Sequence, residues 1–391
     1  MKQVYLIFIV FFFGCQSKQT TDESTKIIKV DLNSPQKASL FDYFKSIELI
    51  PLETNSDVLI GSPRKMIYHQ NRYYIFDKHR NKHVVHIFDD WGKFIFNIDK
   101  RGNGPGEYTY IDDMIINPLT GNIDLLSPFG WVYSYDLFGN YVKTSDKITD
   151  SELKAIHNMI VIDEKASVYY SASNPLQIIY YNTEDNKVLR QEYKENYFIS
   201  SFSTYYPFYE YNGKWHFYRT FDNSTYELGS DSLTVAYTWD FGKLNYNPNS
   251  VGSGITSFSS ISRAEYGEMV VEHTKLLPYR FRIQCQNDRY IIAQIILENT
   301  DYFNGKGTLK LGYLVYDKSA QKCIFIKNFD EAVRFYPMIT TNEYALSFCK
   351  HEELELYVNK EMLDETNRQK FEDLINAKEE ENPIIIKYYF K

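Results

Sequence analysis

The sequence from Val84 to Tyr108, VVHIFDDWGKFIFNIDKRGNGPGEY, contains two devices that decide the fold. The first is a hairpin, in which two alternating runs flank the turn Asp89-Asp90-Trp91-Gly92. Asp suits this turn because it bonds its own backbone, and Gly because it adopts positive φ without strain. The second is the stretch Arg101–Tyr108, whose three glycines and one proline exclude a helix or a central strand. We therefore expect a β-hairpin followed by a tightly shaped loop.

The hairpin is a repeated unit. The stretch Tyr133–Tyr141 copies the pattern of His86–Phe94, and the turn glycines Gly92 and Gly139 lie 47 residues apart (139 minus 92). A period of this length, filled with short alternating strands, is typical of four-stranded propeller blades. At this period the chain has room for six blades. The sequence therefore predicts an all-β, six-bladed β-propeller of four-stranded antiparallel blades.

Several segments have separate roles in this prediction. Ile47–Leu52 precedes the first blade and is a candidate to close the ring by pairing with the other terminus. The blades are expected at about 59–98, 111–142, 156–193, 207–241, 279–326 and from 327 to the C-terminus. Leu244–Leu277 interrupts the rhythm as an insertion, with a short helix expected over Arg263–Leu276. Lys360–Lys378 has helical spacing, and Asn382–Phe390 is a strong final strand.

Composition supports this fold and excludes one class of partner. Aromatic residues make up 17% of the 391 residues, which favours strands because rings pack well on pleated surfaces. The net charge is −8 with the charges interspersed. A nucleic-acid partner would require a concentrated basic face, so nucleic-acid binding is not expected.

The N-terminus has the features of an export signal. Val4–Phe13 is an apolar run too short to span a bilayer as a mature helix, and Gly14-Cys15 follows it. A small residue directly before a cysteine resembles the lipobox of bacterial lipoproteins, although Phe12 and Phe13 depart from its usual residues. The resemblance implies cleavage before Cys15 and lipidation of its thiol. We expect a signal peptide at 1–14, a tether at 15–45 that could include a first strand at Lys26–Val30, and the propeller at 46–391, outside the cytoplasm.

The mature chain contains three further cysteines, Cys285, Cys323 and Cys349. An odd number without a C-x-x-C pair is neither a disulfide framework nor a zinc site. Each lies in or beside an apolar run, which favours a buried hydrophobic role. One disulfide among the three remains open.

The sequence resembles the six-bladed β-propeller lipoproteins of Bacteroidetes, which are related in shape to NHL-repeat propellers. The resemblance rests on motifs in the same order along most of the mature chain: Leu49–Thr54, Leu59–Gly61, Phe88–Phe94, Arg101–Tyr108, Asp240–Lys243 and Asn382–Ile385. It implies a propeller anchored in the cell envelope, and we expect it at the outer membrane, on either its periplasmic or its surface face. It implies no reaction and no ligand.

Candidate ligand-binding residues fall into three groups. In the glycine-rich loop, Arg101, Glu107 and Tyr108 could contact an anion through backbone N–H groups and a cation, although the loop also has to form a sharp crossover between blades. Asp112 and Asp113 open the second blade and could bind a cation such as calcium, although capping a turn explains them too. Tyr206, Arg219 and Phe221 belong to an aromatic cluster in the fourth blade that could bind sugars or peptides, or simply pack between blades.

Motifs for catalysis are weak. The eight histidines are scattered, and only His79 and His83 have a spacing that could suit a metal. There is no Gly-x-Ser-x-Gly motif for a serine hydrolase. The sequence therefore favours a recognition module for a polymer, peptide or partner protein, without a cofactor. A metal-assisted hydrolase or lyase in the channel and a structural subunit of an outer-membrane complex remain alternatives, since the fold alone does not decide function.

Overall fold

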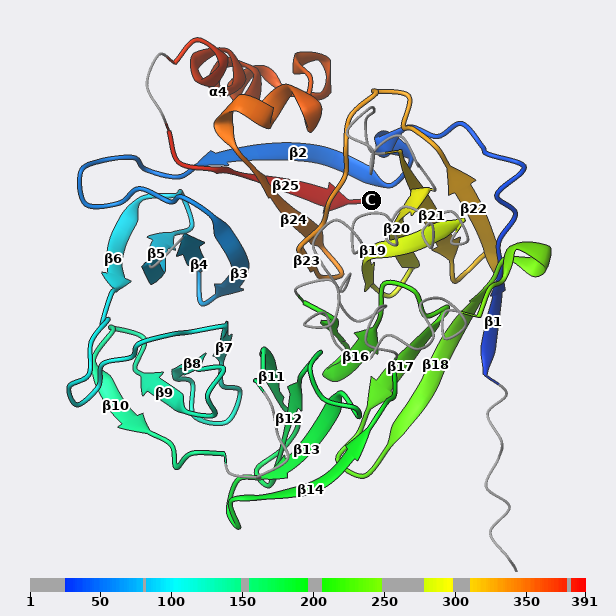
Figure 1. Cartoon of the computed structure of the whole chain (residues 1–391). Coiled ribbons are helices and arrows are strands. Elements are labelled where there is room, and N and C mark those ends of the chain that lie inside the picture. The colour runs from blue at the N-terminus through cyan, green and yellow to red at the C-terminus, as the bar shows by residue number, and fades with distance from the viewer. Residues whose placement is uncertain are drawn as a thin grey trace, which may run out of the picture.

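The computed structural model describes residues 25–79, 82–148, 155–195, 206–247, 278–297, 310–377 and 381–391. Within these residues the strands form six sheets that stand around a common centre (Figure 1). Each sheet contains four antiparallel strands, and one carries an additional fifth strand at its edge. The predicted six-bladed β-propeller is thus confirmed. The helix expected over Arg263–Leu276 lies outside the described residues.

The blades follow the chain in order, and in the first five the innermost strand comes first. Blade one contains β3 (Pro63–His69), β4 (Arg72–His79), β5 (Lys82–Asp89) and β6 (Phe94–Ile98). Blade two contains β7 (Asp113–Ile116), β8 (Ile123–Leu126), β9 (Val132–Tyr135) and β10 (Tyr141–Thr144). Blade three contains β11 (Asn158–Val161), β12 (Ala166–Tyr170), β13 (Ile178–Asn182) and β14 (Lys187–Glu192). Blade four contains β15 (Phe208–Tyr211), β16 (Lys214–Tyr218), β17 (Ser224–Leu228) and β18 (Leu233–Asp240). Blade five contains β19 (Tyr279–Gln286), β20 (Tyr290–Leu297), β21 (Leu311–Asp317) and β22 (Lys322–Ile326).

The sixth blade joins the two ends of the chain. Its strands are β23 (Ile339–Thr340), β24 (Tyr344–Cys349), β25 (Ile384–Phe390) and β2 (Phe44–Pro51), with β2 outermost. β2 pairs antiparallel with β25 along its length, from Phe44 opposite Phe390 to Pro51 opposite Ile384. The prediction that Ile47–Leu52 closes the ring is confirmed. Unfolding one end of the chain therefore removes a strand from the ring, which couples the N- and C-terminal segments energetically.

Asn382 locks this closure at a position just before β25. Its side chain accepts a hydrogen bond from Ile60 N (2.8 Å) and donates to Glu53 O (2.7 Å) and Val58 O (3.1 Å). Its backbone N–H donates to Thr54 Oγ1 (2.8 Å), and the residue is only 2% exposed. We call Asn382 and these four partners the closure clasp. It brings together three of the motifs that carry the family resemblance, which explains them as parts of one structural device.

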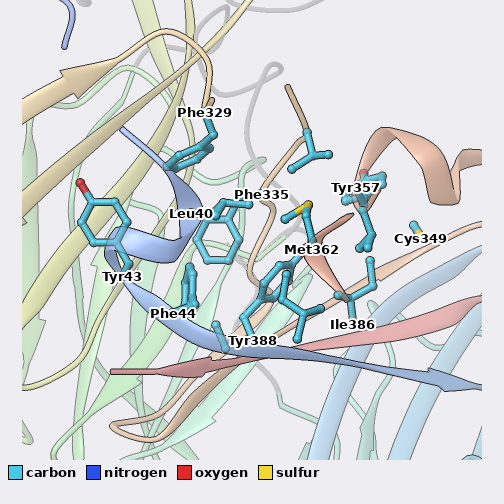
Figure 2. Packing of buried hydrophobic residues seen from close by; sticks show 14 of the residues in the cluster. Leu40, Tyr43, Phe44, Phe329, Phe335, Cys349, Tyr357, Met362, Ile386 and Tyr388 are labelled. Atoms are coloured by element: carbon cyan, nitrogen blue, oxygen red, sulfur yellow. The ribbon is translucent and has the colours of Figure 1, made fainter. Parts of the chain in front are cut away.

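The chain joins the fold earlier than the expected tether boundary at residue 45. β1 (Lys26–Lys29) pairs in parallel with β18 at the outer edge of blade four, with Lys26 opposite Tyr237. Further on, Leu40 and Phe44 are buried in a core cluster beside blades five and six. In Figure 2 the Phe44 ring lies close to Phe335 and Tyr388, with ring centroids 5.2 and 5.4 Å apart. The expected tether therefore extends no further than residue 25.

The two repeated hairpin turns, in blades one and two, each lie against the preceding blade of the ring. In the first turn, Asp89 Oδ1 accepts from the backbone N–H groups of Trp91 and Lys93, and Asp136 forms the same bonds in the second blade. Gly92 has φ of +81°, and a Cβ there would lie 2.2 Å from Pro51 O in β2. The turn thus requires glycine both for its conformation and for close contact with the neighbouring blade.

Blades packed on both sides explain the aromatic excess. In the central strand β4, Tyr73, Tyr74, Ile75 and Phe76 are at most 1% exposed. Both faces of such a strand are apolar because each blade contacts a neighbour on each side.

The three cysteines are free thiols. Burial raises the pKa of each to about 12, as expected for small apolar residues rather than reactive ones.

Short helices follow β24 and cover the outer side of blade six. These are the 3-10 helices η5 (His351–Leu356) and η6 (Lys360–Met362) and the α-helix α4 (Glu365–Ile375). Asp364 caps α4 by accepting from Asn367 N (2.8 Å), and Asn367 in turn accepts from Leu49 N of β2 (2.9 Å). Phe371 and Leu374 are buried as predicted, whereas Ile375 is 40% exposed. Two more 3-10 helices are η1 (Leu40–Asp42) and η2 (Gly242–Leu244).

Candidate functional site

The centre of the propeller contains a cavity of about 1450 Å³. Residues of the innermost strand of every blade line it, namely β3, β7, β11, β15, β19 and β23. The size exceeds the roughly 300–1,000 Å³ of typical small-molecule pockets. A cavity that is reached by all six blades can contact one ligand from several directions, so we take it as the candidate site.

The cavity lining is richer in cations than in anions. Its cationic side chains are Arg64, Lys65, Arg280, Arg282 and Lys350, and its carboxylates are Glu210 and Glu353. Burial raises the pKa of the Glu210 carboxyl above its ordinary value. The whole chain, by contrast, carries a net charge of −8. A cationic interior in an acidic protein indicates a site suited to an anionic group.

Two of the innermost strands are bulged, and each bulge falls on an arginine. In β3, Pro63 pairs with Asp77 and Lys65 with Phe76, so that Arg64 is the extra residue. In β19, Phe281 pairs with Ile295 and Ile283 with Gln294, so that Arg282 is the extra residue. The pairings of the other four innermost strands show no such shift. Bulges re-aim side chains and are frequent beside binding sites.

Arg282 lies in the wall between blades five and six. Its Nη1 donates to Gln294 Oε1 (3.2 Å), and its guanidinium lies over the Tyr336 ring, 4.3 Å from the centroid. Among the described residues, no ion pair links Arg282 to a carboxylate, including Glu353 on the same cavity wall. A half-buried guanidinium without a protein counter-ion is a natural partner for the acidic group of a ligand.

Amide and aromatic side chains complete this wall. Gln284 is 1% exposed, and its Oε1 accepts from Thr225, Tyr237 and Trp239. Its Nε2 has no hydrogen-bond partner in the described part of the chain. The aromatic residues of the lining include Tyr68, Tyr206, Tyr209, Tyr211, Trp215 and Tyr336. Rings together with amides can contact a ligand that has flat faces and hydroxyl groups.

His216 supports the cavity from behind. Its ring stacks on Tyr209 at 4.9 Å with an interplanar angle of 3°, and its Nε2 lies 3.2 Å from Gln286 Nε2. Burial lowers the pKa of His216 to about 4. The folded protein therefore keeps this imidazole neutral at pH values where the unfolded chain protonates it.

This difference predicts a loss of stability in mild acid. The pKa of His216 is lower in the folded protein than in the unfolded chain. The stability that the neutral His216 contributes is therefore fully present above pH 6.5 and is lost as the pH falls toward 4. From pH 7 to 5 we expect a decrease of about 2 kcal/mol in the free energy of unfolding from this residue. Urea unfolding of the wild type and of His216→Gln at both pH values measures it. An equal pH dependence in the two proteins would refute this role of His216.

The glycine-rich loop is built from internal contacts. Glu107 accepts from Gly104 N (2.8 Å), and a Cβ on Gly102 would collide with the Glu107 carboxylate. Tyr108 is 1% exposed and donates to His83 O (2.7 Å). The ion pairs among the described residues do not include one between Arg101 and Glu107. None of the candidates Arg101, Glu107 and Tyr108 lines the cavity, and the geometry matches the crossover interpretation of this loop.

Asp112 and Asp113 are already engaged by protein cations. Asp112 contacts Lys78 Nζ and lies 2.8 Å from His157 Nδ1; burial alone would raise its pKa, but these two partners outweigh it and lower the pKa. Asp113 pairs with Lys65 Nζ (2.8 Å) and accepts from Met159 N (3.0 Å). Ammonium groups therefore occupy the positions that a bound calcium would need, and calcium binding here stays a prediction. The described residues contain no group of three or more possible metal ligands.

The other sequence candidates separate in space. Tyr206 lines the cavity and lies 5.0 Å from Lys65 Nζ, measured from its ring centroid. Phe221 is 1% exposed, which agrees with the alternative that this aromatic residue packs between blades. Arg219 is fully buried and forms an ion pair with Glu195 (2.7 Å). His83 Nδ1 lies 2.8 Å from Ile111 O, a structural contact that does not involve His79.

Sequence reasoning missed Arg64, Arg282 and Gln284. The signal was present in Tyr279–Gln286, where Arg280 and Arg282 interrupt a strand that is otherwise aromatic, aliphatic or amide-bearing. Alternation alone could not find it, because the bulge at Arg282 shifts the side chains that follow.

Comparison with known proteins agrees with this architecture. A solved structure of a Bacteroides fragilis protein described as exported is similar, with a TM-score of 0.67 at 14% identity, covering 94% of this chain and 100% of that one. A member of the DUF4221 family from Bacteroides vulgatus has a TM-score of 0.51 at 10% identity, covering 89% and 97%. At these identities the likeness shows the fold alone.

Two further observations concern family and membrane. No curated protein matches this chain. No helix in the described residues is long and apolar enough to cross a bilayer. The family model for a domain of unknown function, DUF4934, matches residues 25–389. The chain, a six-bladed propeller over nearly the whole of that match, therefore belongs to the DUF4934 family.

Proposed function

We propose that this protein is a recognition module of the bacterial cell envelope that binds a polymer, peptide or partner protein in the central cavity of its propeller. The observation that carries this proposal is the cavity of about 1450 Å³ lined from all six blades. Its contents favour binding over structural packing, because cations, amides and partly exposed rings face it together.

The proposed location rests on the sequence. A short apolar run followed by Gly14-Cys15 suits export and lipidation at Cys15, and an outer-membrane lipoprotein with an NHL-like propeller is the form we propose. The similarity to a Bacteroides protein described as exported fits this location. Mass spectrometry of the mature N-terminus tests it: an acylated Cys15 is expected as the first residue, and an unprocessed Met1 would contradict it.

The binding role is tested by filling the cavity. Ile116 in β7 lines it and is partly buried, so Ile116→Trp should occupy space that a ligand needs. We expect the full chain, purified in a nonionic detergent, to bind one or more members of a panel of neutral and acidic oligosaccharides and peptides. Ile116→Trp should weaken that binding at least about tenfold, a loss of roughly 1.4 kcal/mol.

A matched variant controls for the added indole. Ile95 lies in the outermost strand β6, is 39% exposed and does not line the cavity. Ile95→Trp should leave affinity unchanged. Calorimetric titration of the three proteins decides the matter. Binding that is equally strong in the Ile116→Trp variant would place the ligand elsewhere and overturn the proposal, as would a panel without any binder.

A further inference from the structure

We infer that the cavity recognises an acidic oligosaccharide, and that Arg282 binds its acidic groups. This inference rests on the proposed function, because it names the ligand class of the same cavity. The starting point is the charge of the lining, which carries five cations and two carboxylates; of these cations, Lys65 pairs with Asp113 and Lys350 with Glu352. The cations come from separate blades, with Arg64 and Lys65 on β3, Arg280 and Arg282 on β19, and Lys350 after β24. Charges distributed in this way suit a ligand that repeats its acidic group.

Arg282 is the best-defined cation of the set. The bulge in β19 leaves it without a partner in the strand pairing. Its two contacts among the described residues are both neutral: the Gln294 amide oxygen and the Tyr336 ring. The contact with Gln294 uses Nη1. The planar guanidinium carries five N–H donors, and a carboxylate or sulfate can accept two of them at once. Arg282 is thus oriented by neutral neighbours, and its charge is left to be balanced by a ligand.

The rest of the lining favours a sugar over a peptide. Tyr336, Tyr209 and Trp215 line the cavity, with Arg282 over one face of Tyr336 and His216 stacked on one face of Tyr209. Gln286 of β19 lines it as well and carries an amide group. Pyranose rings have apolar faces with hydroxyl groups at their edges, so rings and amides together match them.

The experiment separates charge from ring shape. The probes are oligogalacturonate, hyaluronate and heparin-derived oligosaccharides, the fully methyl-esterified oligogalacturonide, and poly-L-glutamate as an acidic peptide. The methyl ester has the same sugar rings without the charge. We expect the full chain to bind at least one acidic oligosaccharide, to bind the ester at least about tenfold more weakly, and to lose affinity as the salt concentration rises.

Variants then locate the charge recognition. Arg282→Gln should weaken binding of the acidic oligosaccharide about tenfold to a hundredfold and leave the weak binding of the methyl ester unchanged. Arg289→Gln is the matched control. Arg289 is in the same blade and also lies over a tyrosine ring, 5.0 Å from the Tyr290 centroid, but it does not line the cavity. This control should bind like the wild type.

Each other outcome has a defined meaning. Equal affinity for the acid and its ester, or an unchanged Arg282→Gln variant, would overturn the role of charge while the proposed cavity function stands. Binding of poly-L-glutamate without any acidic oligosaccharide would overturn the sugar assignment. If no probe binds and the broader panel also contains no binder for the wild-type chain, the proposed function is overturned as well.

Discussion

The Asn382→Ala substitution is expected to lower the free energy of unfolding by about 3–5 kcal/mol, since each buried polar group left without its partner costs about 1–3 kcal/mol. The removed amide satisfies Ile60 N, Glu53 O and Val58 O in the closure clasp. Val58 is fully buried and Ile60 is 8% exposed, so water cannot readily replace the lost bonds. Urea unfolding monitored by circular dichroism measures the change.

Two further variants make this prediction specific. Asn382→Asp preserves size but turns a carboxylate oxygen toward two carbonyl groups, so it should destabilise the protein to a similar degree. Asn376→Ala removes a comparable amide bond, from Nδ2 to Glu372 O (2.7 Å), at the exposed end of α4. It should cost less than about 1 kcal/mol. If Asn382→Ala proved no more harmful than Asn376→Ala, the clasp would not be a determinant of ring closure.

The buried ion pair of blade four should give the second large effect. Arg219 donates to Glu195 Oε2 through Nε (3.1 Å) and Nη2 (2.7 Å), with side chains 0% and 5% exposed. Removing one partner of such a pair leaves a buried charge uncompensated. We expect Glu195→Leu or Arg219→Met alone to cost about 3–5 kcal/mol. Denaturant unfolding at neutral pH provides the measurement.

The double variant separates the pair from the packing around it. Glu195→Leu combined with Arg219→Met removes both charges and should cost less than either single change, because no charge stays buried. An exposed pair, Lys214 with Glu227 (2.7 Å), serves as the comparison, and Glu227→Gln should cost less than about 1 kcal/mol. If the loss of stability in the double variant equals the sum of the losses in the two single variants, Arg219 and Glu195 are not coupled.

The sequence predicted those parts of the fold that depend on local chemistry. Asp89 and Gly92 specify their turn through bonds and dihedral angles within a few residues, and the same pattern at Asp136 and Gly139 predicted the period. The ring closure was also predictable, because strong strand patterns at both ends of the chain leave few alternative partners in a propeller. The pairing of the short strand β1 with β18 was not predictable, because the two strands lie far apart in the sequence.

The candidate site was much less predictable. Whether Arg219 or Arg282 faces a ligand depends on packing between blades that are far apart in sequence. Both arginines stand among aromatic residues, yet one is sealed against Glu195 and the other lines the cavity. The bulges at Arg64 and Arg282 also break the alternation on which strand prediction relies. Only the assembled ring shows which cations have a protein counter-ion.

The most direct test of the account is a crystal structure of the full chain with the tightest-binding acidic oligosaccharide from the panel. The account predicts ligand density within the central cavity, with an acidic group within hydrogen-bonding distance of the Arg282 guanidinium and a sugar ring against an aromatic side chain of the lining. Ligand density confined to the outer edges of the blades, with the cavity containing only solvent, would contradict it.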